Sequence, residues 1–388
     1  SDSTGGTPGR ENSQAYFTDP GLPQLISGSF ESRSSVRLTF DRYMASKSLN
    51  TAIITSNNTA LSIESYSPAS ILGATDSFQR GEVYTIEIDS VNDCVGNSLI
   101  RASIDLYLPA MNNVVINEVL FNPRGSGTDF VELYNQSGCD INLENWSLAF
   151  YDSKDSLRFN SVSETSAIIL AGDYLALNED STDLIQNYPQ GTTDNFLTTN
   201  LPSHANDAGS VILYDQLGEL LDHFDYNEDV HFALLDETDG VSLERLDASR
   251  ASDDKGNWHS ASSTDNYATP GYRNSQDYPS SAGTSEFSLS AEYVSPDNDG
   301  YQDVVNINYV LNEPGYVAAV NIYSDKGVLV RALVSNQTLG NTGFITWDGT
   351  NDLGEKARTG IHVILIETFD LDGNRNQYRL PVVVATRL

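Results

Sequence analysis

Basic residues are scarce in this sequence. Lys and Arg number 21 against 54 Asp and Glu in 388 residues, which gives a formal net charge of −33. A nucleic-acid-binding protein needs a basic face that displaces counterions from phosphates, and anionic lipid attracts basic segments. The charge balance therefore argues against both nucleic acid and an anionic membrane surface as partners.

Cysteine and long apolar runs are also nearly missing. The two cysteines, Cys94 and Cys139, lie far apart, so we interpret them as free, buried thiols rather than a disulfide framework. No apolar run approaches the ~20 residues that span a bilayer, and we expect no direct membrane span. No Gly-x-Ser-x-Gly elbow, P-loop, dinucleotide glycine pattern or H-E-x-x-H motif occurs. We therefore expect that the chain is not an enzyme.

What the sequence does contain is a regular β pattern. Hydrophobic residues make up 39% and aromatics 10% of the chain, enough for packed cores. Short runs such as Val36–Phe40 and Val83–Ile88 alternate apolar and polar residues between Gly, Asn and Asp clusters, which is typical of half-buried strands. We predict an all-β fold of tandem Ig-like β-sandwich domains, with further strands over 114–121, 129–135, 146–151, 167–171, 174–178, 210–214, 220–226, 241–246, 304–311, 316–323, 328–334, 343–347, 361–369 and 377–385.

A repeated octapeptide suggests the domain boundaries. Thr7–Gln14 and Thr269–Gln276 share six of eight residues, and linker-like sequence follows each copy. We interpret the first copy as the tail of a preceding domain and the second as the end of a domain of the same kind. The expected organisation is a remnant over 1–14, domains over 15–109 and 110–278, a linker over 279–284 and a last domain over 285–388.

One loop carries a candidate metal site. Residues 295–303 read Ser-Pro-Asp-Asn-Asp-Gly-Tyr-Gln-Asp, and alternating acids on a Gly turn place carboxylates on one side of a loop. Ca²⁺ binds about six to eight such oxygens. We predict a structural Ca²⁺ held by Asp297, Asp299, the Tyr301 carbonyl and Asp303. The alternative is an acidic turn without an ion, since Asn306 stands where an EF-hand has its bidentate acid.

Three other features leave alternatives open. Nine acids and no Lys or Arg lie between Asp215 and Asp239, which indicates either a surface for a cation or basic partner, or a solubilising face. His223 and His231 flank acids and could bind a transition metal, although ordinary histidines fit as well. Trp146, Trp258 and Trp347 could form a sugar-stacking platform, or they could fill sandwich cores.

Several segments contain motifs that resemble known families. Within 110–278 these motifs occupy residues 115–123, 129–135, 141–146, 240–245, 257–261 and 268–271. Through them the segment resembles the bacterial lamin tail domain, an Ig-like sandwich common in secreted proteins of the Bacteroidetes. In the last segment the motifs occupy residues 295–303, 321–327, 346–352 and 359–361, and they resemble the Ig-like domain of the flagellar hook-capping protein (FlgD-like). Through Leu38–Asp41 and Asp93–Asn97, the first segment is similar to bacterial Ig-like domains.

These resemblances imply a non-enzymatic, modular, extracellular protein of a bacterium with an outer membrane. We expect a scaffold or recognition subunit at the cell surface, held by an outer-membrane or surface protein complex and plausibly accessory to secretion or assembly. The alternative is an adhesin or a carbohydrate-binding surface protein, for which a glycan would be the partner. The resemblance to a flagellar protein does not place the chain in a flagellum, since fold does not fix function.

Overall fold

The computed structural model divides into two compact units, Ser1–Leu108 and Pro109–Leu388. It describes residues 21–152, 154, 156–202, 204–276, 286–311, 316–339, 342–369 and 374–385. The predicted remnant over 1–14 and the predicted linker over 279–284 lie outside these residues. No helix in the described part of the chain is long and apolar enough to cross a membrane.

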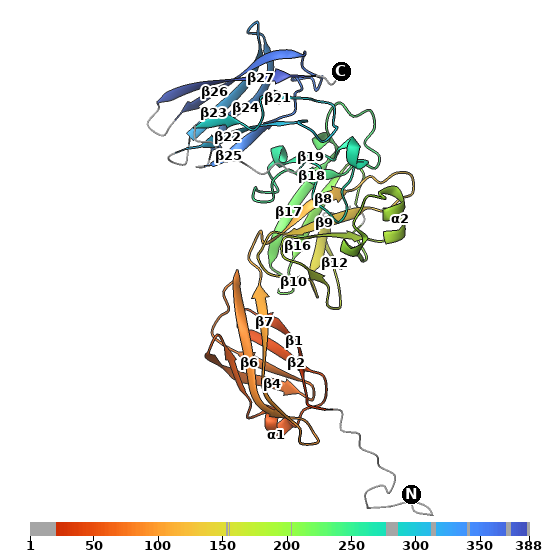
Figure 1. Ribbon diagram of the computed structural model, residues 1–388, viewed down its shortest axis with the longest axis vertical. Helices are drawn as coiled ribbons and strands as arrows, with labels where there is room; N and C mark the ends of the chain where they lie inside the picture. Colours follow the sequence, from red (N-terminus) through yellow and green to blue (C-terminus); the bar gives the residue numbers. More distant parts are fainter. Residues whose placement is uncertain are drawn as a thin grey trace, which may run out of the picture. The chain divides into compact units, whose positions relative to one another are not determined.

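The first unit is built almost entirely of strands (Figure 1). Its elements are β1 (Leu25–Ser32), β2 (Ser35–Phe40), α1 (Ser46–Leu49), β3 (Ile53–Ser56), β4 (Thr59–Ser67), β5 (Ser70–Ala74), β6 (Glu82–Asn92) and β7 (Ser98–Leu108). The strand order is β1-β2-β5-β4-β3-β6-β7.

Strand β4 joins the two halves of this sheet. Its first residues pair with β3, and its later residues pair with β5, with a register shift between Ile63 and Ser65. A strand that bulges in this way can leave one sheet and enter another. The inward residues of β2, β3, β5 and β6 are fully buried, among them Leu38, Ile54, Ile71 and Ile86.

The second unit has an N-terminal lobe, residues 109–276, and a C-terminal lobe, residues 286–385. The N-terminal lobe contains a six-stranded sheet, β15-β14-β9-β8-β18-β19, a four-stranded sheet, β12-β11-β16-β17, and the pair β10-β13. Its elements are β8 (Val114–Leu120), β9 (Phe130–Asn135), β10 (Ile141–Asn142), β11 (Ser147–Tyr151), β12 (Leu157–Ser161), β13 (Ile168–Ile169), β14 (Tyr174–Asn178), α2 (Ser181–Asn187), η1 (Thr193–Asn195), β15 (Phe196–Thr198), β16 (Ala208–Tyr214), β17 (Leu220–Asn227), η2 (Glu228–Val230), β18 (Leu243–Arg245), η3 (Lys255–Asn257), β19 (Trp258–Ser260) and η4 (Ser263–Asp265).

The short helix α2 lies in the stretch between β14 and β15. Asp180 caps it, because its carboxylate accepts hydrogen bonds from the N–H groups of Thr182 and Asp183. Leu184 and the following Tyr188 are buried against Phe130 and other apolar side chains of the sheet. The helix therefore covers one end of the six-stranded sheet.

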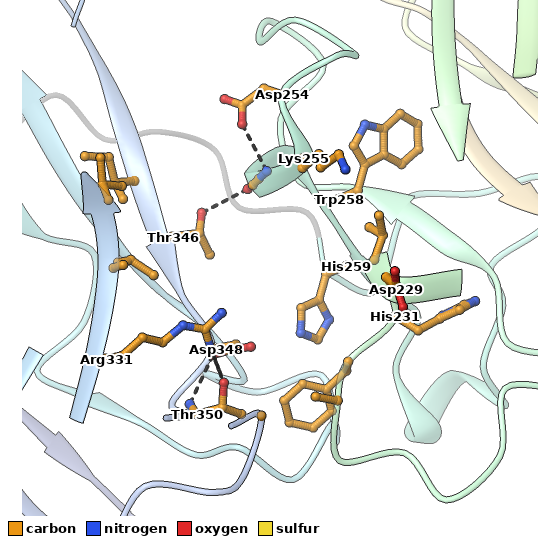
Figure 2. Close-up of a pocket in the computed structure, with 18 of the residues that line it drawn as sticks. Asp229, His231, Asp254, Lys255, Trp258, His259, Arg331, Thr346, Asp348 and Thr350 are labelled. Atoms are coloured by element: carbon orange, nitrogen blue, oxygen red, sulfur yellow. Dashed lines mark hydrogen bonds and ion pairs between the residues drawn. The ribbon is translucent and has the colours of Figure 1, made fainter. Parts of the chain in front are cut away.

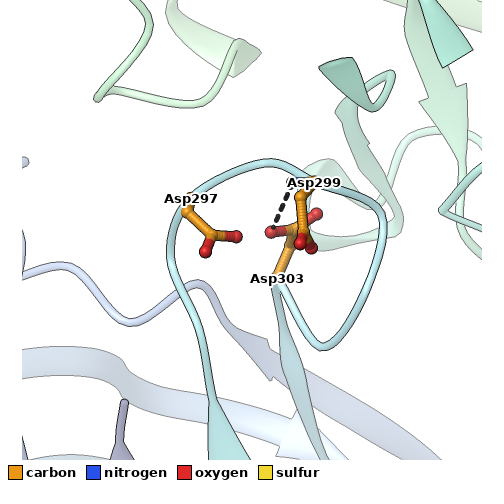
Figure 3. Close-up of side chains that lie close together, drawn as sticks. All are labelled: Asp297, Asp299 and Asp303. Carbon is orange, nitrogen blue, oxygen red and sulfur yellow. Dashed lines mark hydrogen bonds between the residues drawn. The ribbon is translucent and has the colours of Figure 1, made fainter. Parts of the chain in front are cut away.

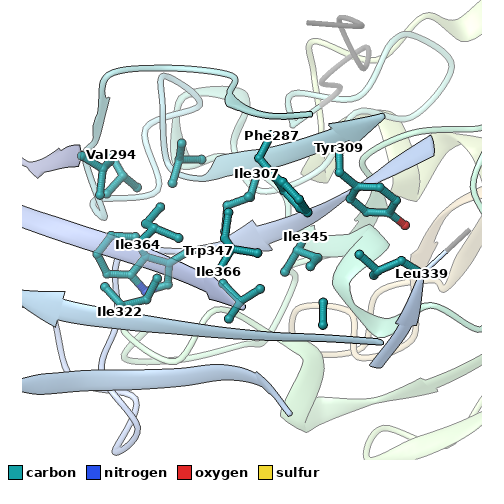
Figure 4. Packing of buried hydrophobic residues seen from close by; sticks show 14 of the residues in the cluster. Phe287, Val294, Ile307, Tyr309, Ile322, Leu339, Ile345, Trp347, Ile364 and Ile366 are labelled. Carbon is teal, nitrogen blue, oxygen red and sulfur yellow. The ribbon is translucent and has the colours of Figure 1, made fainter. Parts of the chain in front are cut away.

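The C-terminal lobe is a sandwich of a three-stranded sheet, β20-β22-β25, and a five-stranded sheet, β21-β27-β26-β23-β24. Trp347 lies fully buried in the core that both sheets share (Figure 4), and its indole N–H donates to the Thr350 carbonyl at 2.9 Å. The strands are β20 (Phe287–Leu289), β21 (Tyr293–Val294), β22 (Val305–Val310), β23 (Tyr316–Ser324), β24 (Leu329–Leu339), β25 (Thr342–Trp347), β26 (Gly360–Phe369) and β27 (Arg375–Val384).

The predicted all-β, Ig-like fold is confirmed. Each strand expected from alternation has a counterpart; the weakest, 167–171, keeps only Ile168–Ile169. The interpretation of both cysteines as buried thiols is wrong: both are free, but Cys94 is exposed and Cys139 is only partly buried. Cys94 follows the bridge residue Asp93 in a turn, which leaves its side chain exposed.

Candidate functional site

Three of the four predicted metal ligands come together in one loop before β22. One carboxylate oxygen each from Asp297, Asp299 and Asp303 lies within 4.8 Å of the others, and Figure 3 shows the three side chains converging inside the loop. Tyr301 adjoins the cluster through its N–H, which donates to Asp299 Oδ1 at 2.9 Å. This donor set consists of hard oxygens, which suits Ca²⁺.

Backbone N–H groups of the loop bind Asp303, the buried member of the cluster. Asp303 accepts hydrogen bonds from the N–H of Asp299 at 3.2 Å and from that of Gly300 at 2.7 Å. Gly300 has a φ of +82°, a backbone conformation that residues other than glycine rarely adopt. Burial raises the pKa of the Asp303 carboxyl, and hydrogen bonds from Gln276 and Gly300 oppose that rise. Asp297, by contrast, is exposed.

The same loop is fastened to the N-terminal lobe. The Asn298 carbonyl accepts hydrogen bonds from the N–H and the hydroxyl of Ser263 at 2.8 and 2.7 Å. The Asn298 amide donates to the Ala261 carbonyl at 2.9 Å, and Gln276 Nε2 donates to Asp303 at 3.1 Å. An ion bound by this loop would therefore lie next to the junction of the two lobes.

A second polar cluster lies inside the six-stranded sheet, where three glutamates form a row. Glu118 on β8 stands opposite Glu132 on β9 and opposite Glu244 on β18. All three are fully buried. Like charges directly opposite each other destabilise a sheet, so this row needs donors or protons to persist.

The segment Thr269–Gln276 supplies those donors. The N–H of Thr269 donates to Glu118 at 2.9 Å and that of Gly271 to Glu132 at 2.5 Å. Glu244 accepts hydrogen bonds from the N–H groups of Ser275 and Gln276 at 3.1 and 2.8 Å. We call Glu118, Glu132 and Glu244 the glutamate row. Its hydrogen bonds hold the segment Thr269–Gln276, at the end of the N-terminal lobe, against the sheet.

The row retains protons at neutral pH. Burial, followed by the charge of Glu244, raises the pKa of Glu118 to about 8, and burial raises the pKa of Glu244 to about 7. Thr269 Oγ1 lies 2.9 Å from Glu118 Oε2 and 2.8 Å from Glu244 Oε1. A hydroxyl has one proton to donate, so one of these contacts needs a protonated carboxyl group as its donor.

The hydrogen bonds to the glutamate row give the second copy of the repeated octapeptide a structural role. The two positions at which the copies differ are Tyr272, which is partly buried, and Arg273, which is exposed. Five of the six shared positions are buried in the second copy, and the sixth, Ser275, is partly buried and bonds to Glu244. The shared residues are thus those that the fold encloses. The first copy lies outside the described residues.

Of the two alternatives for the tryptophans, the structure confirms core filling and excludes a sugar-stacking platform. Trp146, Trp258 and Trp347 are 0%, 4% and 0% exposed. The Trp258 ring stacks on Phe224 with centroids 3.6 Å apart, and its N–H donates to the Ser252 carbonyl. These rings fill cores, because an indole buries a large apolar area.

The histidines do not assemble a transition-metal site in the described part of the chain. His223 is partly exposed and contacts Asp225 at 2.9 Å. His231 is buried, its Nδ1 is 2.9 Å from Ser260 Oγ, and burial lowers its pKa to about 4. Among the described residues, only the three aspartates group closely enough to share an ion.

Sequence reasoning missed the glutamate row. A partial signal was present: Glu118 and Glu132 each stand among apolar residues of β8 and β9, whereas Glu244 lies in the short strand Leu243–Arg245. The sequence does not reveal the strand order, and only the strand order places these three residues side by side.

Comparisons with known proteins were made on sequence and on structure. Residues 22–106 match a bacterial Ig-like domain, and residues 109–228 match the lamin tail domain. The pairing of β18 with β8 continues the same sheet beyond residue 228. No curated protein matches the sequence.

Solved structures with local similarity include a DUF4876 family protein from Bacteroides thetaiotaomicron, at 10% identity over 50% of this chain and 82% of that one, with a TM-score of 0.24. The N-terminal part of the S-layer protein SbsC matches at 11% identity over 53% of this chain and 44% of that one, with a TM-score of 0.22. Latent PorU from Porphyromonas gingivalis matches at 10% identity, with a TM-score of 0.21, over 94% of this chain but only 34% of that one. The chain thus contains a bacterial Ig-like domain followed by a lamin tail domain.

Proposed function

We propose that this chain is a non-enzymatic, modular cell-surface protein that acts as a scaffold or recognition subunit. The observation that carries the proposal is the fastened junction in the second unit, where Asn298, Gln276 and Ser263 tie the two lobes together. Such a junction fixes the relative position of two sandwiches, which suits a protein that holds surfaces in place. Loops and strand edges on a rigid scaffold are common binding elements.

Within this class, we propose that the chain is held at the outer membrane as an accessory subunit of a secretion or assembly complex. This assignment extends the surface role that the bacterial Ig-like domain and the lamin tail domain support. The test is affinity recovery of the tagged full-length protein from gently solubilised native outer membranes. Stoichiometric recovery with a β-barrel protein supports the proposal, whereas recovery of the chain alone counts against it.

An adhesin or carbohydrate-binding protein is the alternative. All three tryptophans are buried, so they cannot form the sugar-stacking platform that a carbohydrate-binding protein would need. A glycan array probed with the labelled protein tests the adhesin or carbohydrate-binding alternative. Specific binding to one glycan class would favour it. We propose no catalytic role.

We also propose that the loop over 295–303 binds a structural Ca²⁺. Asp297, Asp299, Asp303 and the Tyr301 carbonyl would be its ligands, and the ion would stiffen the loop that contacts Ser263 and Ala261. A ligand that binds only the folded state raises stability by about 2.7 kcal/mol at 100 times its Kd.

The calcium proposal is tested by calorimetric titration of the chelator-treated protein. We expect a heat of binding and a rise in the Tm of the second unit. Asp299→Asn should abolish both, while Asp325→Asn, on an exposed turn, should abolish neither. Absence of heat together with an unchanged Tm in the unaltered protein would end the proposal.

A further inference from the structure

The second unit contains a cavity of about 610 Å³ between its lobes. Figure 2 shows its walls: η3 and the start of β19 on one side, and β24 and β25 on the other. The volume lies in the range of ligand pockets, about 300–1,000 Å³.

Three sheet edges meet at this cavity. β19 ends the six-stranded sheet, β24 ends the five-stranded sheet and β25 ends the three-stranded sheet, and all three contribute lining residues. The loop after β25 caps the first part of β24, since Asp352 accepts a hydrogen bond from the Ala332 N–H at 2.9 Å. In the described part of the chain, Leu333 and Val334 receive no such cap. An uncapped edge offers main-chain groups to an added strand.

One side chain in the wall has an unused acceptor. His259 is 6% exposed, and its Nδ1 lies 2.9 Å from the Ser260 carbonyl. A carbonyl only accepts hydrogen bonds, so Nδ1 carries the proton and Nε2 keeps its lone pair. Nε2 has no partner, and the ring points into the cavity (Figure 2). A buried acceptor without a donor costs about 1–3 kcal/mol, so this position favours a ligand that donates a hydrogen bond.

The charges in the wall favour a cation. Arg250 pairs with Asp254, and Arg331 pairs with Asp348 at 2.9 Å. Lys255 is the remaining lining cation, and Asp229 and Asp352 are two further lining carboxylates, so the wall carries one more acid than base. Asp229 also belongs to the stretch from Asp215 to Asp239 that contains nine acids and no Lys or Arg.

The aromatic rings of the wall do not suit a sugar. One face of Trp258 is stacked on Phe224, and the Arg250 guanidinium lies 3.6 Å above the ring centroid of Phe344. Carbohydrate recognition needs an open ring face, and these two rings have faces already occupied by protein groups.

We propose that this cavity binds an extended, basic peptide segment of a partner protein. The segment adds as a strand along the uncapped part of β24. A lysine or arginine side chain donates to His259 Nε2 and forms an ion pair with Asp229. This inference rests on the proposed recognition function, for which it names a site and the chemistry of the partner.

The test uses the full chain labelled with ¹³C and ¹⁵N in histidine. The sequence has only five histidines, so each ring signal can be followed and assigned by single substitutions. The probe is a capped octapeptide of alternating lysine and valine, and the control probe alternates glutamate and valine. We expect the basic peptide to shift the His259 signal saturably and to leave the His223 signal in place, with weaker binding at higher salt.

Matched variants separate the cavity from the general charge of the protein. Asp229→Asn should weaken binding of the basic peptide several-fold, whereas Asp236→Asn, which removes an exposed charge of the same stretch outside the cavity, should change it little. Absence of a His259 shift at millimolar peptide would overturn the proposal, and so would equal effects of the two variants or equal binding of the acidic peptide.

This outcome is independent of the outer-membrane assignment. Peptide binding at His259 would stand even if no membrane partner is recovered. Recovery of a partner by a variant that no longer binds the peptide would assign that partner to another surface.

Discussion

At the scale of single residues, the unusual feature is the glutamate row. Glu118, Glu132 and Glu244 are fully buried and adjacent, and burial raises the pKa of each. The folded state therefore binds protons that the unfolded state releases near pH 4.5. Stability from these groups is complete below that pH and is lost as the pH rises toward 7 to 8.

We predict that the Tm of the second unit falls between pH 6.5 and pH 8.5. His231 opposes this fall near pH 6.5, where its unfolded imidazole is half protonated and burial has lowered its folded pKa to about 4, but it contributes little above pH 7.5. Glu118→Gln keeps an acceptor for the Thr269 N–H but cannot ionise, so the fall should become smaller. A loss of about 1 kcal/mol in the free energy of unfolding corresponds to a decrease in Tm of roughly 2–4 °C.

The measurement is thermal unfolding followed by circular dichroism at several pH values. Glu292→Gln is the matched control, since Glu292 is exposed, and it should keep the slope of the unaltered protein. An identical slope in Glu118→Gln would show that the row does not hold protons.

At the scale of elements, two strand pairs share one packing device. Tyr309 on β22 stands opposite Gly343 on β25, and Tyr226 on β17 stands opposite Gly209 on β16. A Cβ at either glycine would meet the ring or hydroxyl of its tyrosine. The tyrosine therefore covers the glycine and replaces the packing that the missing side chain would provide.

We predict that Gly343→Ala lowers the free energy of unfolding by about 1–3 kcal/mol, the usual cost of overpacking. In a Tyr309→Leu background the same change should cost less, because the obstructing ring is gone. Gly138→Ala, at a position with open space around it, is the control. Denaturant unfolding of the four combinations measures the coupling, and additive effects would contradict it.

The strands were predictable at this scale, because alternation is a local property of sequence. Val83–Ile88 and Gly360–Phe369 show the pattern over several residues, and both became long strands. The three converging aspartates were also predictable, since they lie within seven consecutive positions of one loop. Strand pairing was not predictable. The first residues of β4 pair with β3 and its later residues pair with β5, with a register shift in the second pairing.

At the scale of the whole molecule, the chain consists of two compact units with cores of their own. The first contains Leu38, Ile54 and Ile86, and the second contains Trp146 and Trp347. A unit that buries its own apolar surface can fold by itself.

We predict that fragments 1–108 and 109–388 each unfold cooperatively, and that the calorimetric trace of the full chain contains the transitions of both. The physical reason is that each unit contains a buried apolar core of its own. Scanning calorimetry of the three proteins provides the comparison. A fragment that shows no cooperative transition would contradict the independence of the units.

The sequence by itself determined the all-β class, the positions of most strands and the acidic loop, because each depends on residues close together in the chain. Tertiary structure decided the glutamate row and the cavity. Glu118 meets Thr269 across 151 positions of sequence, and the cavity combines His259 with Arg331 from another lobe. Such sites depend on strand order and lobe packing, which are long-range properties that no local pattern encodes.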